Sequence, residues 1–228
     1  MASSYINGQE IKKIDRKEME EVHSYINEKE AAALANDSYK ENEYNTINGW
    51  KTVKVYNDPK TGFKAKLYEK QGHYAFVTAG TDAISPKDWQ NNVKQQFGFE
   101  AKQYEQSIKI AQSLSKEHEN LIFIGHSLGG GLASANSRAT GRDAITFNAS
   151  ALNNRYNYGM KSRIVSYISD GDILDYTNQK ILGSHVQGQI IRRPVQTSAI
   201  PNLQYVPGTG PYQFVRGVII HLDTIPIK

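Results

Sequence analysis

Residues 120–135 read NLIFIGHSLGGGLASA, and this stretch decides the fold. The apolar residues 121–124 predict a buried strand, and the small residues after the glycines predict a helix. Between them lies Gly-His-Ser-Leu-Gly, at residues 125–129. A turn this tight forces its central residue into a strained backbone conformation and lifts that side chain above the end of the sheet. Ser127 is therefore the candidate nucleophile, and the glycines that follow let the helix pass close to neighbouring strands.

A glycine-rich turn between a strand and a helix is also typical of phosphate-binding loops, or of close packing alone. A phosphate-binding loop of this kind needs a Lys-Ser or Lys-Thr pair after its glycines, and none follows Gly131. The predicted strand and helix lie on the sides of Ser127 that a nucleophile turn requires. The sequence context therefore favours a catalytic serine.

Length and composition restrict the class of protein. The chain has 228 residues, enough for one α/β domain, and no linker divides it, so we expect a single domain over residues 1–228. A mean hydropathy of −0.58 indicates a soluble protein, and no apolar run approaches the roughly 20 residues of a membrane span. The first residues, MASSYINGQE, show no classical secretion signal, so the location stays open and includes export by a signal-independent route.

Residue types and charge exclude several kinds of chemistry. Cysteine is absent, which excludes disulfides, thiolate metal sites and a cysteine nucleophile. The formal net charge of +4 suits anionic surfaces but indicates no nucleic-acid partner. Serine-based nucleophilic chemistry needs neither a metal nor an organic cofactor, and we expect none.

Strand-like and helix-like segments alternate along the chain, which predicts an α/β fold with a mostly parallel central sheet flanked by helices. An N-terminal helical segment at residues 15–39 is expected to cover one face of the sheet. Two alternating runs around the turn at residues 57–62 predict a β-hairpin with one polar face. The other expected elements are strands at 74–79, 121–124, 144–147 and 163–168, helices from Pro86 and around Ala101, and weaker strands at 189–192 and 213–220 joined by a proline-rich loop.

The hairpin is rich in lysine, with Lys51, Lys54, Lys60, Lys64, Lys66 and Lys70. Lysines on such a strand pair commonly form a solvated face. The alternative is a basic patch that faces a phospholipid surface.

A serine hydroxyl becomes a nucleophile when an imidazole accepts its proton and a carboxylate holds that imidazole in one tautomer. On a fold of this kind the chain order is serine, acid, histidine, so both partners follow Ser127. The acids lie in SDGDILD at residues 169–175. We prefer Asp172, because Gly171 before it permits a tight approach, and Asp170 is the alternative. The same aspartates lack the glycine and glutamate that a calcium loop requires.

Two histidines follow the acidic loop. His221 comes directly after a short predicted strand, which is where a base on a loop belongs, and His185 is the alternative. His126 is adjacent to the serine and is expected to line the turn. The donors to the developing oxyanion are expected to be the backbone N–H of Leu128 and, after an earlier strand, Thr81.

Three segments carry a resemblance to a known family. They are AGTDAISPKDWQNN at residues 79–92, IFIGHSLGGGLA at residues 122–133, and SDGDILD followed by a late histidine. Together they resemble the class 3 lipases, the α/β-hydrolases of the fungal triacylglycerol lipase type. The chain looks closer still to bacterial lipase-like domains found in secreted effectors and toxins, some of which act as phospholipases A1.

This resemblance implies an α/β-hydrolase fold, the triad Ser127, Asp172 and His221, and the oxyanion donors Thr81 and Leu128. Two departures bear on the substrate. An alanine stands before Gly-Thr where the family commonly has an arginine, and residues 148–151 read NASA where the family has Pro-Arg-x-Gly.

The implied activity is hydrolysis of lipid carboxylic esters, with phospholipid acyl ester as the first choice. Neutral glycerides or soluble esters are the alternative substrates, and a degenerate lipid- or protein-binding module is the alternative of another class. Transient contact with a membrane surface is expected of such an enzyme, and an immunity protein is the expected partner if the chain is an effector toxin.

Overall fold

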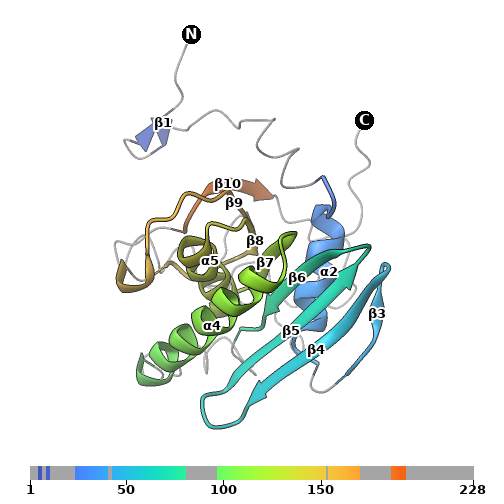
Figure 1. The fold of residues 1–228 in the computed structure, drawn as a ribbon. Helices are drawn as coiled ribbons and strands as arrows, with labels where there is room; N and C mark the ends of the chain where they lie inside the picture. The colour runs from blue at the N-terminus through green and yellow to red at the C-terminus, as the bar shows by residue number, and fades with distance from the viewer. Residues whose placement is uncertain are drawn as a thin grey trace, which may run out of the picture.

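The computed structural model describes residues 5–6, 9–10, 24–40, 43–80, 97–152, 154–169 and 186–193. Within these ranges, eight strands form one sheet in the order β10-β9-β8-β7-β6-β5-β4-β3 (Figure 1). Neighbours from β6 to β10 pair in parallel, whereas β3, β4 and β5 join antiparallel at one side. The strands are β3 (Thr46–Ile47), β4 (Trp50–Asp58), β5 (Phe63–Lys70), β6 (His73–Thr78), β7 (Leu121–His126), β8 (Ala144–Phe147), β9 (Ile164–Ser169) and β10 (Gln189–Arg193).

Helices cover both faces of this sheet. Figure 1 shows α4 (Phe97–Glu117) and α5 (Leu128–Thr140) on one face and α2 (Glu28–Asp37) on the other. The α4 helix joins β6 to β7, and α5 joins β7 to β8, so both connections step along the sheet in the same direction. Because connections between parallel strands are right-handed, both helices lie on the same face. The 3₁₀ helix η1 (Asn154–Tyr156) contacts α5, and a separate antiparallel pair joins β1 (Tyr5–Ile6) to β2 (Gln9–Glu10).

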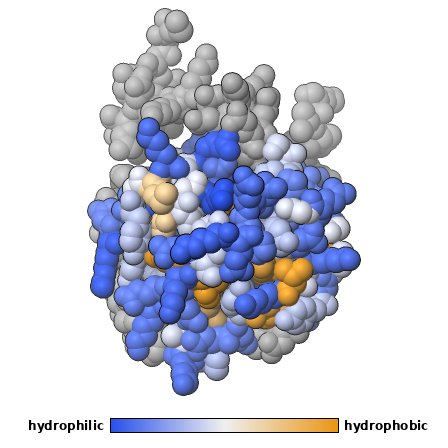
Figure 2. Space-filling model, viewed as in Figure 1, coloured by the Kyte–Doolittle hydropathy of each residue, from blue (hydrophilic) through white to orange (hydrophobic). Residues whose placement is uncertain are grey.

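The α4 helix is amphipathic, as its sequence predicts. Tyr104, Ile108, Ala111 and Leu114 recur at helical spacing and are buried against the sheet. The outer side of the helix is polar, and the molecular face that carries α4 is mostly hydrophilic (Figure 2). This packing closes the core on the α4 and α5 side of the sheet.

The α2 helix begins at a capping box. The backbone N–H of Glu30 donates to Asn27 Oδ1 at 2.9 Å, and the Asn27 N–H donates to Glu30 Oε2 at 3.1 Å. Three small residues and Leu34 then pack against the sheet, which lets the helix lie close to it. The helix ends at Asp37, immediately before Ser38 and Tyr39.

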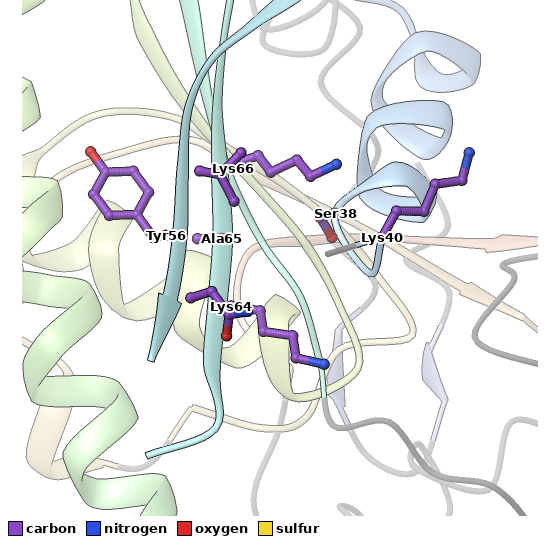
Figure 3. A pocket seen from close by; sticks show the side chains of 8 residues that line it. Ser38, Lys40, Tyr56, Lys64, Ala65 and Lys66 are labelled. Carbon is purple, nitrogen blue, oxygen red and sulfur yellow. The ribbon is translucent and has the colours of Figure 1, made fainter. Parts of the chain in front are cut away.

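The lysine-rich face of β5 lies beneath α2 and is not a solvated face. The Lys66 side chain is only 1% exposed, and its Nζ lies 2.9 Å from Asp37 Oδ2. Tyr68 donates to the same carboxylate oxygen at 2.8 Å, and Asn45 donates to Oδ1 at 2.8 Å. Figure 3 shows Lys66 extending from β5 toward the C-terminal turn of α2. Part of the expected basic surface is therefore an internal ion pair.

The remaining hairpin lysines differ in environment, and Lys64 is partly buried. Lys70 also pairs inward, with Nζ 2.6 Å from Glu30 Oε1. Lys51, Lys54 and Lys60 are exposed on β4 and the hairpin turn. The prediction of a solvated or lipid-facing lysine face is wrong for β5, because alternation in the sequence does not reveal that helices cover both faces of this strand.

The predicted order of elements is confirmed wherever the described residues cover it. The hairpin, the parallel strands, α4 and the strand-turn-helix at Ser127 all lie where the patterns placed them. Several expectations lie outside the described residues, namely the helix from Pro86, the proline-rich loop after Arg193, the strand at 213–220 and most of the helical segment before residue 24. None of the helices in the described part of the chain is long and apolar enough to cross a membrane.

Replacing Asp37 by Asn should destabilise the protein by about 3–5 kcal/mol at pH 7, because it leaves the Lys66 ammonium buried without its carboxylate. Burial alone would raise the pKa of Asp37, but hydrogen bonds from Lys66, Asn45 and Tyr68 hold that pKa below its usual 3.8. The carboxylate therefore contributes stability above about pH 4 and loses it as pH falls through the lowered value.

Denaturant titrations at pH 7 and pH 3 check this expectation. The difference in unfolding free energy between wild type and Asp37→Asn should be smaller at pH 3. Glu105→Gln is the control, because its ion pair with Arg155 is exposed, with side chains 60% and 70% accessible, and it should change stability by less than about 0.5 kcal/mol. An equal effect of the two substitutions would contradict a stabilising role for the buried pair.

Candidate active site

The turn between β7 and α5 has the geometry of a nucleophile elbow. Ser127 has φ 57° and ψ −127°, a conformation that costs a residue with a Cβ about 1–3 kcal/mol. Its side chain makes no capping hydrogen bond to the helix that it precedes. The strain predicted from the sequence is confirmed, and the residue is 7% exposed.

Backbone hydrogen bonds hold Ser127 from both sides. Its N–H donates to the carbonyl of Phe147 at 3.1 Å, which ties it to β8. Its carbonyl accepts from the N–H groups of Gly130 at 3.0 Å and Ser150 at 2.9 Å. As the first residue of α5, Leu128 has a backbone N–H that finds no acceptor within the helix. This N–H and the positive end of the helix dipole suit an oxyanion beside Ser127.

Glycines allow α5 to press against the sheet. A Cβ added to Gly129 would lie 2.1 Å from the Thr78 carbonyl oxygen, and one added to Gly125 would lie 2.1 Å from the Gly129 carbonyl oxygen. The Thr78 hydroxyl donates to the Gly129 carbonyl at 2.7 Å and strengthens the same contact. The predicted close approach of helix and strand is therefore confirmed.

The end of β6 lies directly beside the serine. A Cβ built on Gly80 would lie 3.1 Å from Ser127 Cβ and 2.9 Å from the His126 carbonyl oxygen. Gly80 is the last described residue before Thr81, the expected second oxyanion donor. The structure thus brings the start of the Gly-Thr segment to Ser127, while Thr81 itself lies outside the described residues.

His126 is buried and hydrogen-bonded beneath the elbow. It is 3% exposed, and burial lowers its pKa to about 3, so the imidazole is neutral at physiological pH. Its Nδ1 lies 2.8 Å from the Tyr39 hydroxyl oxygen, which also accepts the Gly80 N–H at 3.1 Å. The position agrees with the expectation that His126 lines the turn. Tyr39 was missed, because no local pattern links it to the serine.

The proposed acids follow a strand that ends at the same sheet edge as Ser127. β7, β8 and β9 are parallel neighbours, with Phe147 paired to both His126 and Tyr167. β9 ends at Ser169, directly before Asp170. Asp170 and Asp172 lie outside the described residues, and the end of β9 is consistent with either as the acid.

Both candidate bases, His185 and His221, also lie outside the described residues. Val186, which follows His185 directly, packs with Ala149 and Ile168. Ala149 in turn lies against Gly130 in the first turn of α5, so the described chain next to His185 is close to the Ser127 turn. His185 therefore stays an alternative to His221 as the partner of the serine.

Comparison with known proteins identifies the family. A family model described as a Tle-like phospholipase domain matches residues 22–210, most of the chain. The chain belongs to this family. An extracellular phospholipase A1 of Serratia liquefaciens is 39% identical over 97 residues, which are 42% of this chain and 30% of that protein. The chain thus matches less than a third of this relative's own length.

Solved fungal lipases share the fold of this Tle-like phospholipase domain. A triacylglycerol lipase from Penicillium expansum gives a TM-score of 0.53 at 14% identity and covers 73% of this chain and 77% of its own. Lipase II from Rhizopus niveus gives a TM-score of 0.51 at 17% identity, and the match covers 69% of this chain and 74% of that lipase. The α/β-hydrolase fold and the lipase-like family predicted from the sequence are confirmed.

Substituting Gly129 by Ala should destabilise the protein by about 2–3 kcal/mol and lower its activity, because the new methyl group forces α5 away from β6. Thermal unfolding and ester hydrolysis measure the two effects. Gly159→Ala is the control, since a Cβ there meets nothing within 4 Å and adds only the strain of φ +73°, about 1 kcal/mol. Wild-type stability and activity in Gly129→Ala would show that the elbow does not depend on this contact.

Proposed function

We propose that this chain, as a single domain over residues 1–228, is a phospholipase A1-like serine esterase with Ser127 as its nucleophile. The strained, uncapped serine at the start of α5, beside Gly80, is the observation that carries the proposal. An ester carbonyl above Ser127 would present its oxygen to the Leu128 N–H and the helix dipole. The same geometry would stabilise the tetrahedral oxyanion more than the ground-state carbonyl.

In the first half-reaction, Ser127 Oγ attacks the acyl carbon, and His221 accepts the hydroxyl proton while Asp172 orients the imidazole. Collapse of the oxyanion breaks the ester bond, and the leaving alkoxide takes the proton from His221. Water then attacks the acyl-serine with His221 as base, and the fatty acid leaves with Ser127 restored. Thr81 is the proposed second oxyanion donor, and Asp170 and His185 are the alternative partners.

Phospholipid acyl ester is the proposed substrate. The family description and the Serratia liquefaciens relative, named as an extracellular phospholipase A1, support it. Neutral glyceride is the second candidate, because the Penicillium expansum neighbour is named as a triacylglycerol lipase, although that likeness concerns the fold. The extracellular relative also supports export of this chain. Transient contact with a membrane surface belongs to the same proposal, and an immunity protein is the proposed partner if the chain is an effector toxin.

Hydrolysis of a lipid panel by wild type and Ser127→Ala tests the proposed function. The panel contains phosphatidylcholine, phosphatidylethanolamine, triacylglycerol and a short soluble ester, with the released fatty acid identified by position. The variant should lose turnover by about 1,000-fold or more, with phospholipid the preferred substrate of wild type. Ser113→Ala, which removes an exposed hydroxyl on α4, should retain wild-type activity.

A fluorophosphonate probe separates an esterase from a binding module with the same fold. The probe should label wild type at Ser127 and leave Ser127→Ala unlabelled. Undiminished hydrolysis by Ser127→Ala, or labelling at another residue, would refute the nucleophile.

The base is assigned by comparing His221→Ala with His185→Ala. Loss of about 1,000-fold in kcat is expected in the first, because an unassisted serine hydroxyl is a weak nucleophile, and near wild-type kcat is expected in the second. Circular dichroism of each variant checks that it is folded. Loss confined to His185→Ala would transfer the role of base to His185.

A further inference from the structure

One phenol joins the two sides of the proposed oxyanion hole. The Tyr39 hydroxyl oxygen accepts the Gly80 N–H at 3.1 Å and lies 2.8 Å from Nδ1 of His126. Gly80 precedes Thr81, and His126 precedes Ser127, so each partner is adjacent to a residue of the proposed reaction. A phenol has one proton and can accept as well as donate, so it can receive the Gly80 N–H and donate to a neutral imidazole at once.

The Gly80 N–H is therefore occupied and does not serve the oxyanion. Its acceptor is a side chain that packs edge-on against the His126 ring, with centroids 6.0 Å apart. The contact leaves little room, because a Cβ on Gly80 would approach the Tyr39 hydroxyl oxygen to 2.7 Å. The position of Gly80 relative to the elbow thus depends on where the phenol is held.

The C-terminal turn of α2 holds that phenol. Asp37, two residues before Tyr39, is fixed to β5 by Lys66 and Tyr68. The Ser38 hydroxyl donates to the Ala35 carbonyl at 2.7 Å and closes the turn. Figure 3 shows Ser38 and Lys40 on this turn, opposite Lys66 on β5. A network of buried polar contacts therefore sets the position of Tyr39 independently of Ser127.

We propose that Tyr39 is a positioning residue of the oxyanion hole, which holds the Gly80 backbone in register with the elbow through His126. This role rests on the proposed esterase function. Tyr39 acts through Gly80 and His126 and does not touch the reacting atoms. Without the Tyr39 hydroxyl, the distance between the Thr81 and Leu128 donors would be less well fixed. Stabilisation of an oxyanion depends steeply on the geometry of its donors.

The test compares Tyr39→Phe with wild type in steady-state kinetics on the best substrate of the lipid panel. The ring and its packing remain, and only the hydroxyl is lost. We expect kcat per active site to fall roughly 10- to 100-fold with KM changed less than about twofold, because substrate binding does not use the hydroxyl. The second-order rate of fluorophosphonate labelling at Ser127 should fall in parallel, since that reaction also builds charge on an oxygen in the hole.

Tyr56→Phe is the matched control. Tyr56 lies on the neighbouring strand β4, and Figure 3 shows its ring on the opposite side of β5 from the lysines. This variant should keep wild-type kcat and labelling rate. The melting temperature of Tyr39→Phe should fall by only a few degrees, and end-point fluorophosphonate titration corrects kcat for the fraction of protein that is folded.

The outcomes separate this inference from the proposed function. If Tyr39→Phe keeps wild-type kcat while Ser127→Ala is inactive, the role of Tyr39 is overturned and the proposed esterase function stands. A fall in total activity that disappears when expressed per labelled serine would also overturn it, because the hydroxyl would then serve stability alone. Full activity of Ser127→Ala would overturn the proposed function itself.

Discussion

The contact on which the site depends is the one between the first turn of α5 and the end of β6. Gly129 lies so close to the Thr78 carbonyl that no other side chain fits, and the Thr78 hydroxyl holds the helix there. With the helix pressed against the sheet, the chain must turn from β7 into α5 within one residue. The positive φ of Ser127 thus follows from glycine packing, and it sets the direction of a side chain that is only 7% exposed.

A buried polar network, together with apolar packing, fixes α2 on the opposite face. Alanines bring the helix close to the sheet, but their small side chains specify its position along the axis only weakly. The Asp37 carboxylate accepts hydrogen bonds from Lys66, Tyr68 and Asn45, and these directional contacts fix the position of the helix along its axis. Buried ion pairs contribute little net stability over apolar packing, yet they favour one arrangement over others. Here that arrangement places Tyr39 beneath the elbow.

Local patterns predicted the elements well, because strand and helix periodicity and the Gly-x-Ser-x-Gly turn are encoded by neighbouring residues. The role of Tyr39 and the burial of Lys66 were missed for a physical reason. Their partners His126 and Asp37 lie 87 and 29 residues away, and alternation in β5 gives no sign that a helix covers its lysine face. The sequence Asn27-x-x-Glu30 before the alanines would have placed the start of α2 more accurately. Thr81, Asp172 and His221 stay predictions that the described residues do not test.

The order of strands across the sheet is the order of strands along the chain, from β3 to β10. Each strand pairs with the one synthesised just before it, so a growing chain can extend the sheet from one edge without waiting for distant segments. The antiparallel hairpin and its helix come first, the serine turn is added in the middle, and the strand that precedes the acidic loop comes near the end. The α2 helix and β5, whose contacts hold the turn that carries Tyr39, therefore precede Ser127 along the chain, and this proposed support can form before the Ser127 turn is synthesised.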